Sequence, residues 1–175
     1  MLRVLDAVPR GASLLDIGAG HGLFATLVRA RGASRVVAVE PDLRKVRPID
    51  GIESVIGFDD VVGGRFDAIS IIDVLYKIPL SEWDALLLRC RERLADGGLI
   101  IIKEQDPAAR VKNSWNAMQE RVATALHLTL GESFTYEPPA SFLARLTRLG
   151  FVDARSKRID FGYPHSHVLY VAKRG

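Results

Sequence analysis

The fold is indicated most clearly by the segment Leu14-Leu15-Asp16-Ile17-Gly18-Ala19-Gly20-His21-Gly22. Its first half is an apolar run typical of a buried strand, and its glycines open a segment with the apolar spacing of a helix. Glycine is needed where the backbone takes a positive φ or approaches a ligand closely, and a helix N-terminus offers unpaired N–H groups. The segment therefore predicts a strand, a tight turn and a helix that together form a nucleotide site.

The spacing of the glycines separates two kinds of nucleotide site. The dinucleotide fingerprint G-x-G-x-x-G requires a third glycine at position 23, which is leucine here; the glycines stand instead at 18, 20 and 22. Asp16 leads the loop. Glu40 ends the next predicted strand, where a carboxylate can accept hydrogen bonds from both ribose hydroxyls. This pattern argues against NAD as the ligand.

Short apolar runs alternate with helical patterns along the rest of the chain, which is typical of a parallel sheet covered on both faces. The last two predicted strands are separated by too few residues for a helical crossover, so they should pair antiparallel. The predicted helices lie near 22–31, briefly after Pro41, and at Ser81–Ala95, Val111–Leu128 and Pro139–Leu149. The predicted strands are Ser13–Ile17, Arg35–Glu40, Ile52–Ile56, Asp67–Ile72, Leu99–Lys103, Phe151–Ser156 and Val168–Ala172.

Length and composition limit the class of protein. The chain has 175 residues, 48% of them hydrophobic, so we expect a single domain over residues 1–175. The formal net charge is +3 and no run of five like charges occurs, which argues against nucleic-acid binding. The single cysteine, Cys90, excludes an internal disulfide. No apolar run reaches the roughly 18 residues of a membrane span and no signal peptide is visible, so we expect a cytoplasmic protein.

With these features the chain resembles the class I S-adenosylmethionine-dependent methyltransferases. The first motif of that family is similar to 14–22, and its second strand ends in an acid like Glu40. The segments Arg65-Phe66-Asp67-Ala68-Ile69 and Leu94-Ala95-Asp96-Gly97-Gly98-Leu99-Ile100 resemble its entries into the fourth and fifth strands. The resemblance implies an α/β fold with a Rossmann-like, doubly wound, seven-stranded sheet, mostly parallel with an antiparallel C-terminal strand. It also implies S-adenosyl-L-methionine as the cofactor.

The resemblance assigns the cofactor contacts. Glu40 would hold the ribose, and Pro41, together with Asp42, would flank the adenine. An acid after the third strand commonly receives the adenine amino group; Asp59 is preferred to Asp60, because Phe58 beside it could lie against the ring, although a solvated turn explains both. The methionyl end would be held by Asp16 and by the loop residues Gly18, Ala19, Gly20, His21 and Gly22, and the cofactor's amino group would lie near Asp73 and Val74.

Ligands of open α/β sheets bind beyond the carboxyl ends of the parallel strands, which selects the candidates for catalysis. Methyl transfer from a sulfonium needs mainly alignment of the acceptor, and a base only for some acceptors. The candidate bases are Tyr76, Glu104 and His165; each has a plain alternative, as a core-edge aromatic, a surface carboxylate and a loop residue. His165 and His167 could share a face of a strand, but no third ligand is evident, so we expect no metal site.

Two further segments could line an acceptor site. A stripe at helical spacing runs through Val111, Trp115, Met118, Val122 and Leu126, and indicates either core packing or a cover for an apolar or aromatic acceptor. The loop 160–167 carries Phe161, Tyr163, His165 and His167, which either contact the acceptor or seal the sheet edge.

We therefore predict a methyltransferase acting on a small molecule, with two alternatives. An RNA methyltransferase is favoured by Asp73 and Lys103, which resemble part of the Lys-Asp-Lys-Glu set of ribose 2′-hydroxyl enzymes; the set's first lysine and its glutamate have no counterpart here. A non-catalytic cofactor-binding or interaction domain is favoured by the short stretch before the first strand. The sequence favours no particular acceptor atom or oligomeric state.

Overall fold

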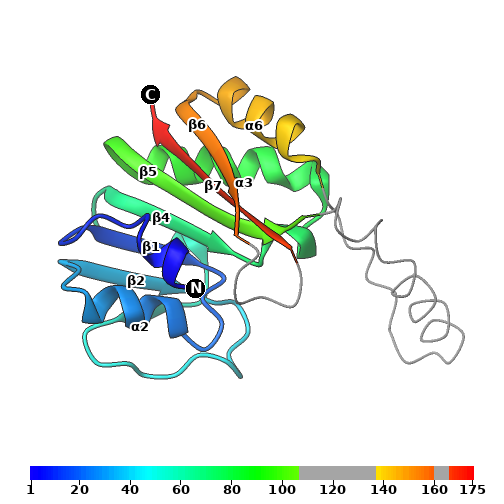
Figure 1. The fold of residues 1–175 in the computed structure, drawn as a ribbon. Coiled ribbons are helices and arrows are strands. Elements are labelled where there is room, and N and C mark those ends of the chain that lie inside the picture. The colour runs from blue at the N-terminus through cyan, green and yellow to red at the C-terminus, as the bar shows by residue number, and fades with distance from the viewer. Residues whose placement is uncertain (107–136, 160–165) are drawn as a thin grey trace, which may run out of the picture.

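A computed structural model describes residues 1–106, 137–159 and 166–175. These residues form one seven-stranded sheet with the strand order β3-β2-β1-β4-β5-β7-β6 (Figure 1). The strands are β1 Ser13–Ile17, β2 Arg35–Val39, β3 Glu53–Val55, β4 Phe66–Ile72, β5 Leu94–Gln105, β6 Phe151–Arg158 and β7 His167–Arg174.

The strand directions confirm the predicted topology. The neighbours from β3 through β5 pair in parallel, and β7 pairs antiparallel with both β5 and β6. The chain runs outward from β1 to β2 and β3, then crosses back to place β4 on the other side of β1. This reversal is the topological switch point, and ligands of such sheets bind there, beyond the carboxyl ends of the strands.

Helices cover both faces of the sheet (Figure 1). The helices α1 (Leu2–Leu5) and α2 (Leu23–Ala30) contribute buried residues to a core on one face, which we call the α2 face. The opposite face, the α3 face, is packed by α3 (Leu80–Arg93) and α6 (Pro139–Arg148). Within the described residues no helix is both long and apolar enough to span a membrane.

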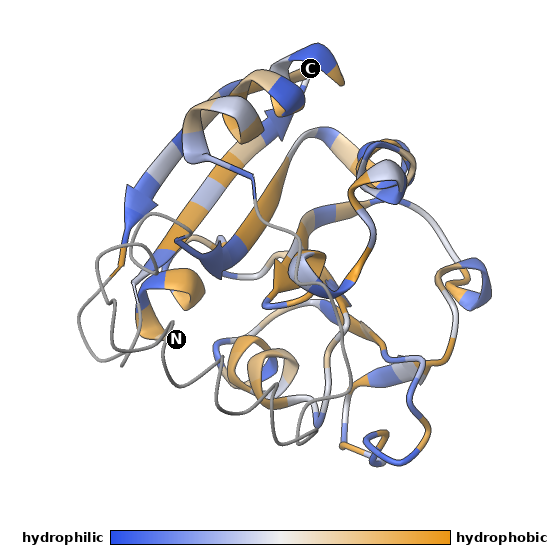
Figure 2. Cartoon of the chain, turned by 90° about the vertical axis from the view of Figure 1, so that its right-hand side faces the viewer, coloured by the Kyte–Doolittle hydropathy of each residue, from blue (hydrophilic) through white to orange (hydrophobic). Residues whose placement is uncertain are grey.

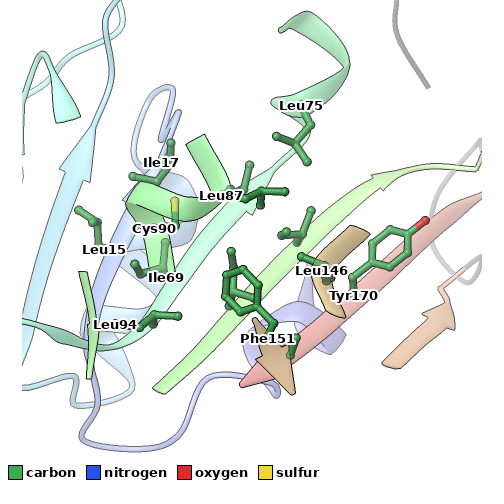
Figure 3. Packing of buried hydrophobic residues seen from close by; sticks show 14 of the residues in the cluster. Leu15, Ile17, Ile69, Leu75, Leu87, Cys90, Leu94, Leu146, Phe151 and Tyr170 are labelled. Atoms are coloured by element: carbon green, nitrogen blue, oxygen red, sulfur yellow. The ribbon is translucent and has the colours of Figure 1, made fainter. Parts of the chain in front are cut away.

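The core of the α3 face contains side chains from the strands and from the helices α3 and α6 (Figure 3). Leu15, Ile69 and Leu87 are fully buried in it, and burial of one such side chain stabilises the fold by roughly 1.5–3 kcal/mol. Tyr170 lies at the margin of this cluster, with its hydroxyl pointing away from the other labelled side chains (Figure 3). Figure 2 shows hydrophobic residues along stretches of the strands, with hydrophilic residues interspersed on both strands and loops.

Three segments differ from the sequence prediction. No helix follows Pro41; the chain there forms turns, in which Asp42 binds Arg44 instead of capping a helix. The fifth strand begins at Leu94 and not at Leu99, because Leu94 pairs with Phe66 before a register shift at the Asp96-Gly97-Gly98 turn. The predicted helix Val111–Leu128, with its apolar stripe, lies outside the described residues.

Candidate functional site

The glycine loop between β1 and α2 is held in a conformation that favours glycine. Gly18, Gly20 and Gly22 have φ values of 68°, 57° and 78°, and Gly22 is the N-cap residue of α2. A Cβ at Gly18 would lie 2.4 Å from Cγ2 of Val74, whereas a Cβ at Gly20 would meet nothing within 4 Å. Gly18 therefore permits contact with the end of β4, and Gly20 faces open space.

Glu40 fastens this loop to the end of β2. Its Oε2 accepts a hydrogen bond from the Gly20 N–H at 2.8 Å, and its Oε1 accepts one from the Asp42 N–H at 2.9 Å. The residue is 8% exposed. Each carboxylate oxygen has two lone pairs, so one on each oxygen can still accept a hydrogen bond from a ligand. Sequence reasoning found Glu40 but missed its bonds to the backbone.

A pocket of about 250 Å³ opens beside the loop. His21 and Glu40, both predicted from the sequence as cofactor-binding residues, are among the residues that line it. Its far wall comes from Val46, Arg47 and Ile49, in the turns that replace the predicted helix. The sequence signal for this wall was weak, because two apolar residues in a loop have no periodicity to interpret.

Asp16 lies deeper, on β1. It is 2% exposed, and its Oδ1 accepts a hydrogen bond of 2.6 Å from the Ser70 hydroxyl on β4. Burial raises the pKa of Asp16 to about 7, and the bond from Ser70 opposes that rise. Strand alternation places Asp16 on the side of Leu14, which belongs to the core of the α2 face.

The end of β4 is tied to β5 through Asp73. Asp73 takes a left-handed conformation with φ 56°, which costs a residue with a side chain about 1 kcal/mol or more. Its N–H donates to the Lys103 carbonyl at 2.9 Å, and its Oδ2 forms an ion pair with the Lys103 ammonium. His167 Nε2 lies 3.8 Å from Asp73 Oδ1. Asp73, predicted to lie near the cofactor's amino group, is therefore accompanied by a buried cation, since the Lys103 side chain is only 2% exposed.

Glu104, on β5, fixes the backbone that follows Asp73. Its Oε1 accepts hydrogen bonds from the N–H groups of Val74 at 3.0 Å and Leu75 at 2.8 Å. Burial raises the pKa of Glu104 to about 7, and the two backbone bonds oppose that rise. The residue is 8% exposed, so the plain interpretation as a surface carboxylate is wrong. No sequence signal connected positions 74 and 104, which are brought together by the pairing of β4 with β5.

The remaining predicted residues lie at the periphery. Tyr76, half-buried, belongs to the 3-10 turn η2 (Leu75–Lys77) directly after β4. Asp59 belongs to η1 (Phe58–Asp60); its side chain is 91% exposed and is paired with Arg89. Pro41 directly follows Glu40 and is exposed. His165 and most of the loop 160–167 lie outside the described residues.

The arrangement thus joins a glycine loop, an acid at the end of β2 and a turn after β4 at the switch point of the sheet. A family model for a methyltransferase domain matches residues 1–156, and the chain belongs to this family. The predicted class, a class I S-adenosylmethionine-dependent methyltransferase with that cofactor, agrees with the match and with the fold. No curated protein sequence matches the chain.

Solved structures of methyltransferases share the fold at low sequence identity. A chain of the complex between the Haloferax volcanii Trm112 methyltransferase activator and its methyltransferase is 15% identical, with a TM-score of 0.75 over 98% of this chain and 86% of that one. An S-adenosylmethionine-dependent methyltransferase of Mesorhizobium loti is 16% identical, with a TM-score of 0.74 over 99% and 96%. The 1,6-didemethyltoxoflavin N1-methyltransferase of Burkholderia thailandensis is 18% identical, with a TM-score of 0.68 over 94% and 72%.

Proposed function

We propose that the chain is an active methyltransferase that binds S-adenosylmethionine across the carboxyl ends of β1, β2 and β4 and methylates a small molecule. The observation that carries the proposal is the glycine loop closed by Glu40. Its three glycines have positive φ, and the buried carboxylate that holds Gly20 keeps a lone pair on each oxygen for the ribose hydroxyls. The Burkholderia relative, which binds a small heterocycle, supports the acceptor class.

The residues around the loop fit this cofactor. Gly20 leaves open space for close approach, and the loop pocket is lined by His21 and by the apolar side chains of Val46 and Ile49. The cofactor supplies a methyl group on a positively charged sulfur, so carboxylates nearby are favourable partners. Glu40 holds the loop through Gly20, and Asp16 lies on β1, two residues before Gly18. The assignments of Pro41 and Asp59 to the adenine remain proposals; Asp59 would exchange its pairing with Arg89 for the adenine amino group.

The chain's own contribution to the reaction is alignment. In-line displacement at the methyl carbon requires the acceptor atom opposite the sulfur, and correct placement alone can supply much of the rate acceleration. Tyr76 and Glu104 lie at the ends of β4 and β5, where an acceptor beside the loop would lie. For an acceptor that must lose a proton, Glu104 is the stronger of the two described candidates, because a carboxyl with a pKa of about 7 can take up a proton near neutral pH.

An RNA acceptor has one observation in its favour, the ion pair between Lys103 and Asp73 at the reacting edge. The Lys103 side chain is 2% exposed, however, and a phosphate or ribose of RNA is reached most easily by exposed cations. Transfer of a labelled methyl group into total RNA, compared with transfer into a metabolite extract, distinguishes the two acceptor classes.

Calorimetry tests the cofactor part of the proposal. We expect S-adenosylmethionine to bind and NAD not to bind, and we expect Glu40→Gln to weaken binding at least about tenfold, because hydrogen bonds to a charged acceptor are lost. The exposed Glu92→Gln on α3 is the matched control and leaves affinity unchanged. Since Glu40 also holds the loop backbone, melting temperatures are measured for each variant. Equal or tighter NAD binding by the wild-type chain overturns the assignment.

A further inference from the structure

A second pocket lies on the α3 face, at the carboxyl end of β5. About 280 Å³ there is not filled by protein atoms, open solvent at its mouth included, and we call it the Glu104 pocket. Besides Glu104, it is lined by Leu75, Trp83, Gln105, Glu137, Phe142 and Tyr170. Its walls come from η2, α3, α6 and β7 together with β5, so it is formed only when the α3 face is fully packed.

Three aromatic rings form the apolar walls of this pocket. The centroids of Trp83 and Phe142 lie 5.8 Å apart with the rings at 89°, and those of Phe142 and Tyr170 lie 4.7 Å apart at 67°. Trp83 Nε1 donates to the carbonyls of Leu75 and Ile78, both at 3.0 Å. Its polar atom is therefore satisfied within the protein, and its ring offers the pocket an aromatic surface.

Glu104 supplies the pocket with an oxygen that lacks a donor. Its Oε1 is occupied by the Val74 and Leu75 N–H groups, but its Oε2 is buried and accepts no hydrogen bond from the described residues. Buried polar atoms in native proteins almost always have a hydrogen-bond partner. A buried acceptor without one, in the wall of an open pocket, indicates a ligand that donates a hydrogen bond.

The charges around the pocket define the kind of donor. Glu137 is compensated by Arg145, whose Nε lies 2.8 Å from Glu137 Oε2 and which also pairs with Asp84. Within the described residues Glu104 forms no ion pair. Carboxylates surround the Tyr170 hydroxyl: burial raises the pKa of Tyr170, and Asp106, Glu104 and Glu137 raise it further, while Lys103 is the cation that acts on Glu104. A cationic donor is favoured over a neutral one, and an anion is repelled.

We propose that the Glu104 pocket binds a protonated amine of the methyl acceptor, with the ammonium hydrogen-bonded to Glu104 Oε2 and the apolar part of the molecule against Trp83, Phe142 and Tyr170. Ammonium groups gain from aromatic faces as well as from carboxylates, so both kinds of wall contribute to recognition. The proposal rests on the proposed function, since it takes the ligand to be the acceptor of that reaction.

One residue connects this pocket to the cofactor loop. Val74 donates its N–H to Glu104, and its side chain is the group that a Cβ at Gly18 would strike. The carboxylate that anchors the amine therefore also positions the residue packed against the glycine loop. This places the proposed amine site next to the loop site, as a methyl acceptor requires.

The test compares three probes of one shape and different charge: benzylamine, benzyl alcohol and benzoate, each titrated into the wild-type chain at pH 8. We expect benzylamine to bind at least about tenfold more tightly than benzyl alcohol, and benzoate to bind most weakly, because a hydrogen bond between charged groups exceeds a neutral one by this margin. Glu104→Gln keeps an acceptor for the backbone N–H groups and should remove the preference for the amine. The control Glu92→Gln should keep it.

Phe142→Leu provides a second variant, which keeps an apolar side chain but removes a ring. We expect it to weaken benzylamine binding severalfold and to affect benzyl alcohol binding less. If Glu104→Gln fails to fold, the wild-type probe ratio and Phe142→Leu decide the matter. Equal affinities for benzylamine and benzyl alcohol overturn the inference. S-adenosylmethionine binding is measured in the same preparations. A wild-type chain that binds the cofactor but shows no preference for benzylamine refutes the amine site alone, whereas a wild-type chain that does not bind the cofactor refutes the proposed function.

Discussion

Alanine substitutions at Gly18 and Gly20 should have different costs, although both change the same residue type in the same loop. Both positions have positive φ, at 68° and 57°, and a left-handed conformation costs a residue with a Cβ roughly 1–2 kcal/mol. At Gly20 nothing lies within 4 Å of the added carbon, so this backbone cost is the whole expected effect.

At Gly18 the added carbon would overlap Val74, with 2.4 Å to Cγ2 and 3.2 Å to Cγ1. Overpacking of this kind costs about 1–3 kcal/mol in addition. We therefore expect Gly18→Ala to lower the free energy of unfolding by about 2–5 kcal/mol, against about 1–2 kcal/mol for Gly20→Ala.

Urea unfolding of four variants measures the effect: Gly18→Ala, Gly20→Ala, Val74→Ala and the double variant Gly18→Ala with Val74→Ala. The Val74→Ala background removes both methyl groups that the new carbon would strike, so Gly18→Ala should there cost no more than Gly20→Ala does in the wild type. Equal costs for the two glycine variants in the wild-type background, or additivity in the double variant, would show that the contact with Val74 does not determine the choice of glycine.

Three further outcomes follow from the structure. Burial raises the pKa of Asp16 to about 7 in the folded chain, above the value of 3.8 in the unfolded chain, so ionisation destabilises the fold as the pH rises from 3.8 to about 7. Urea unfolding should therefore show that Asp16→Asn gains stability relative to wild type between pH 5 and pH 8, by roughly a few kcal/mol at most. The Cys90 thiol is buried, with its pKa raised to about 12, so a thiol reagent should label it only at the unfolding rate; fast labelling of the native protein contradicts this. His21→Ala should change stability by no more than about 0.5 kcal/mol while weakening S-adenosylmethionine, and a lowered melting temperature would assign His21 a structural role.

The strands and the glycine loop could be predicted from sequence because their signals are local. An apolar run ending in Gly18 identifies β1, and the acid at Glu40 follows the next apolar run at the distance that a strand-helix-strand unit requires. The alternation of short apolar runs with helical patterns predicts a parallel sheet covered on both faces, and the resemblance to the methyltransferase family implied its Rossmann-like arrangement.

The contacts that build the rest of the site are not local. Glu104 and the Val74 N–H are 30 residues apart in sequence, and only the register of β4 against β5 brings them together. A short helix was predicted after Pro41, whereas the chain forms turns there and the Asp42 side chain binds Arg44 and Lys45. Burial likewise depends on the whole fold, which is why Glu104 resembled a surface carboxylate in the sequence.

The outer strand β6 has a consequence for solubility. An edge strand presents unpaired backbone groups on which a second chain can add a strand, and aggregation begins in that way. On β6 the ladder with β7 is interrupted between Val152 and Arg155, where Asp153 has a φ of 53° and pairs with Lys173 at 2.7 Å. Beyond the interruption Arg155, Lys157 and Arg158 are exposed and alike in charge. A strand from another molecule that approached β6 would have to pair with a bent backbone beside three basic side chains. Both features oppose intermolecular strand pairing at this edge of the sheet.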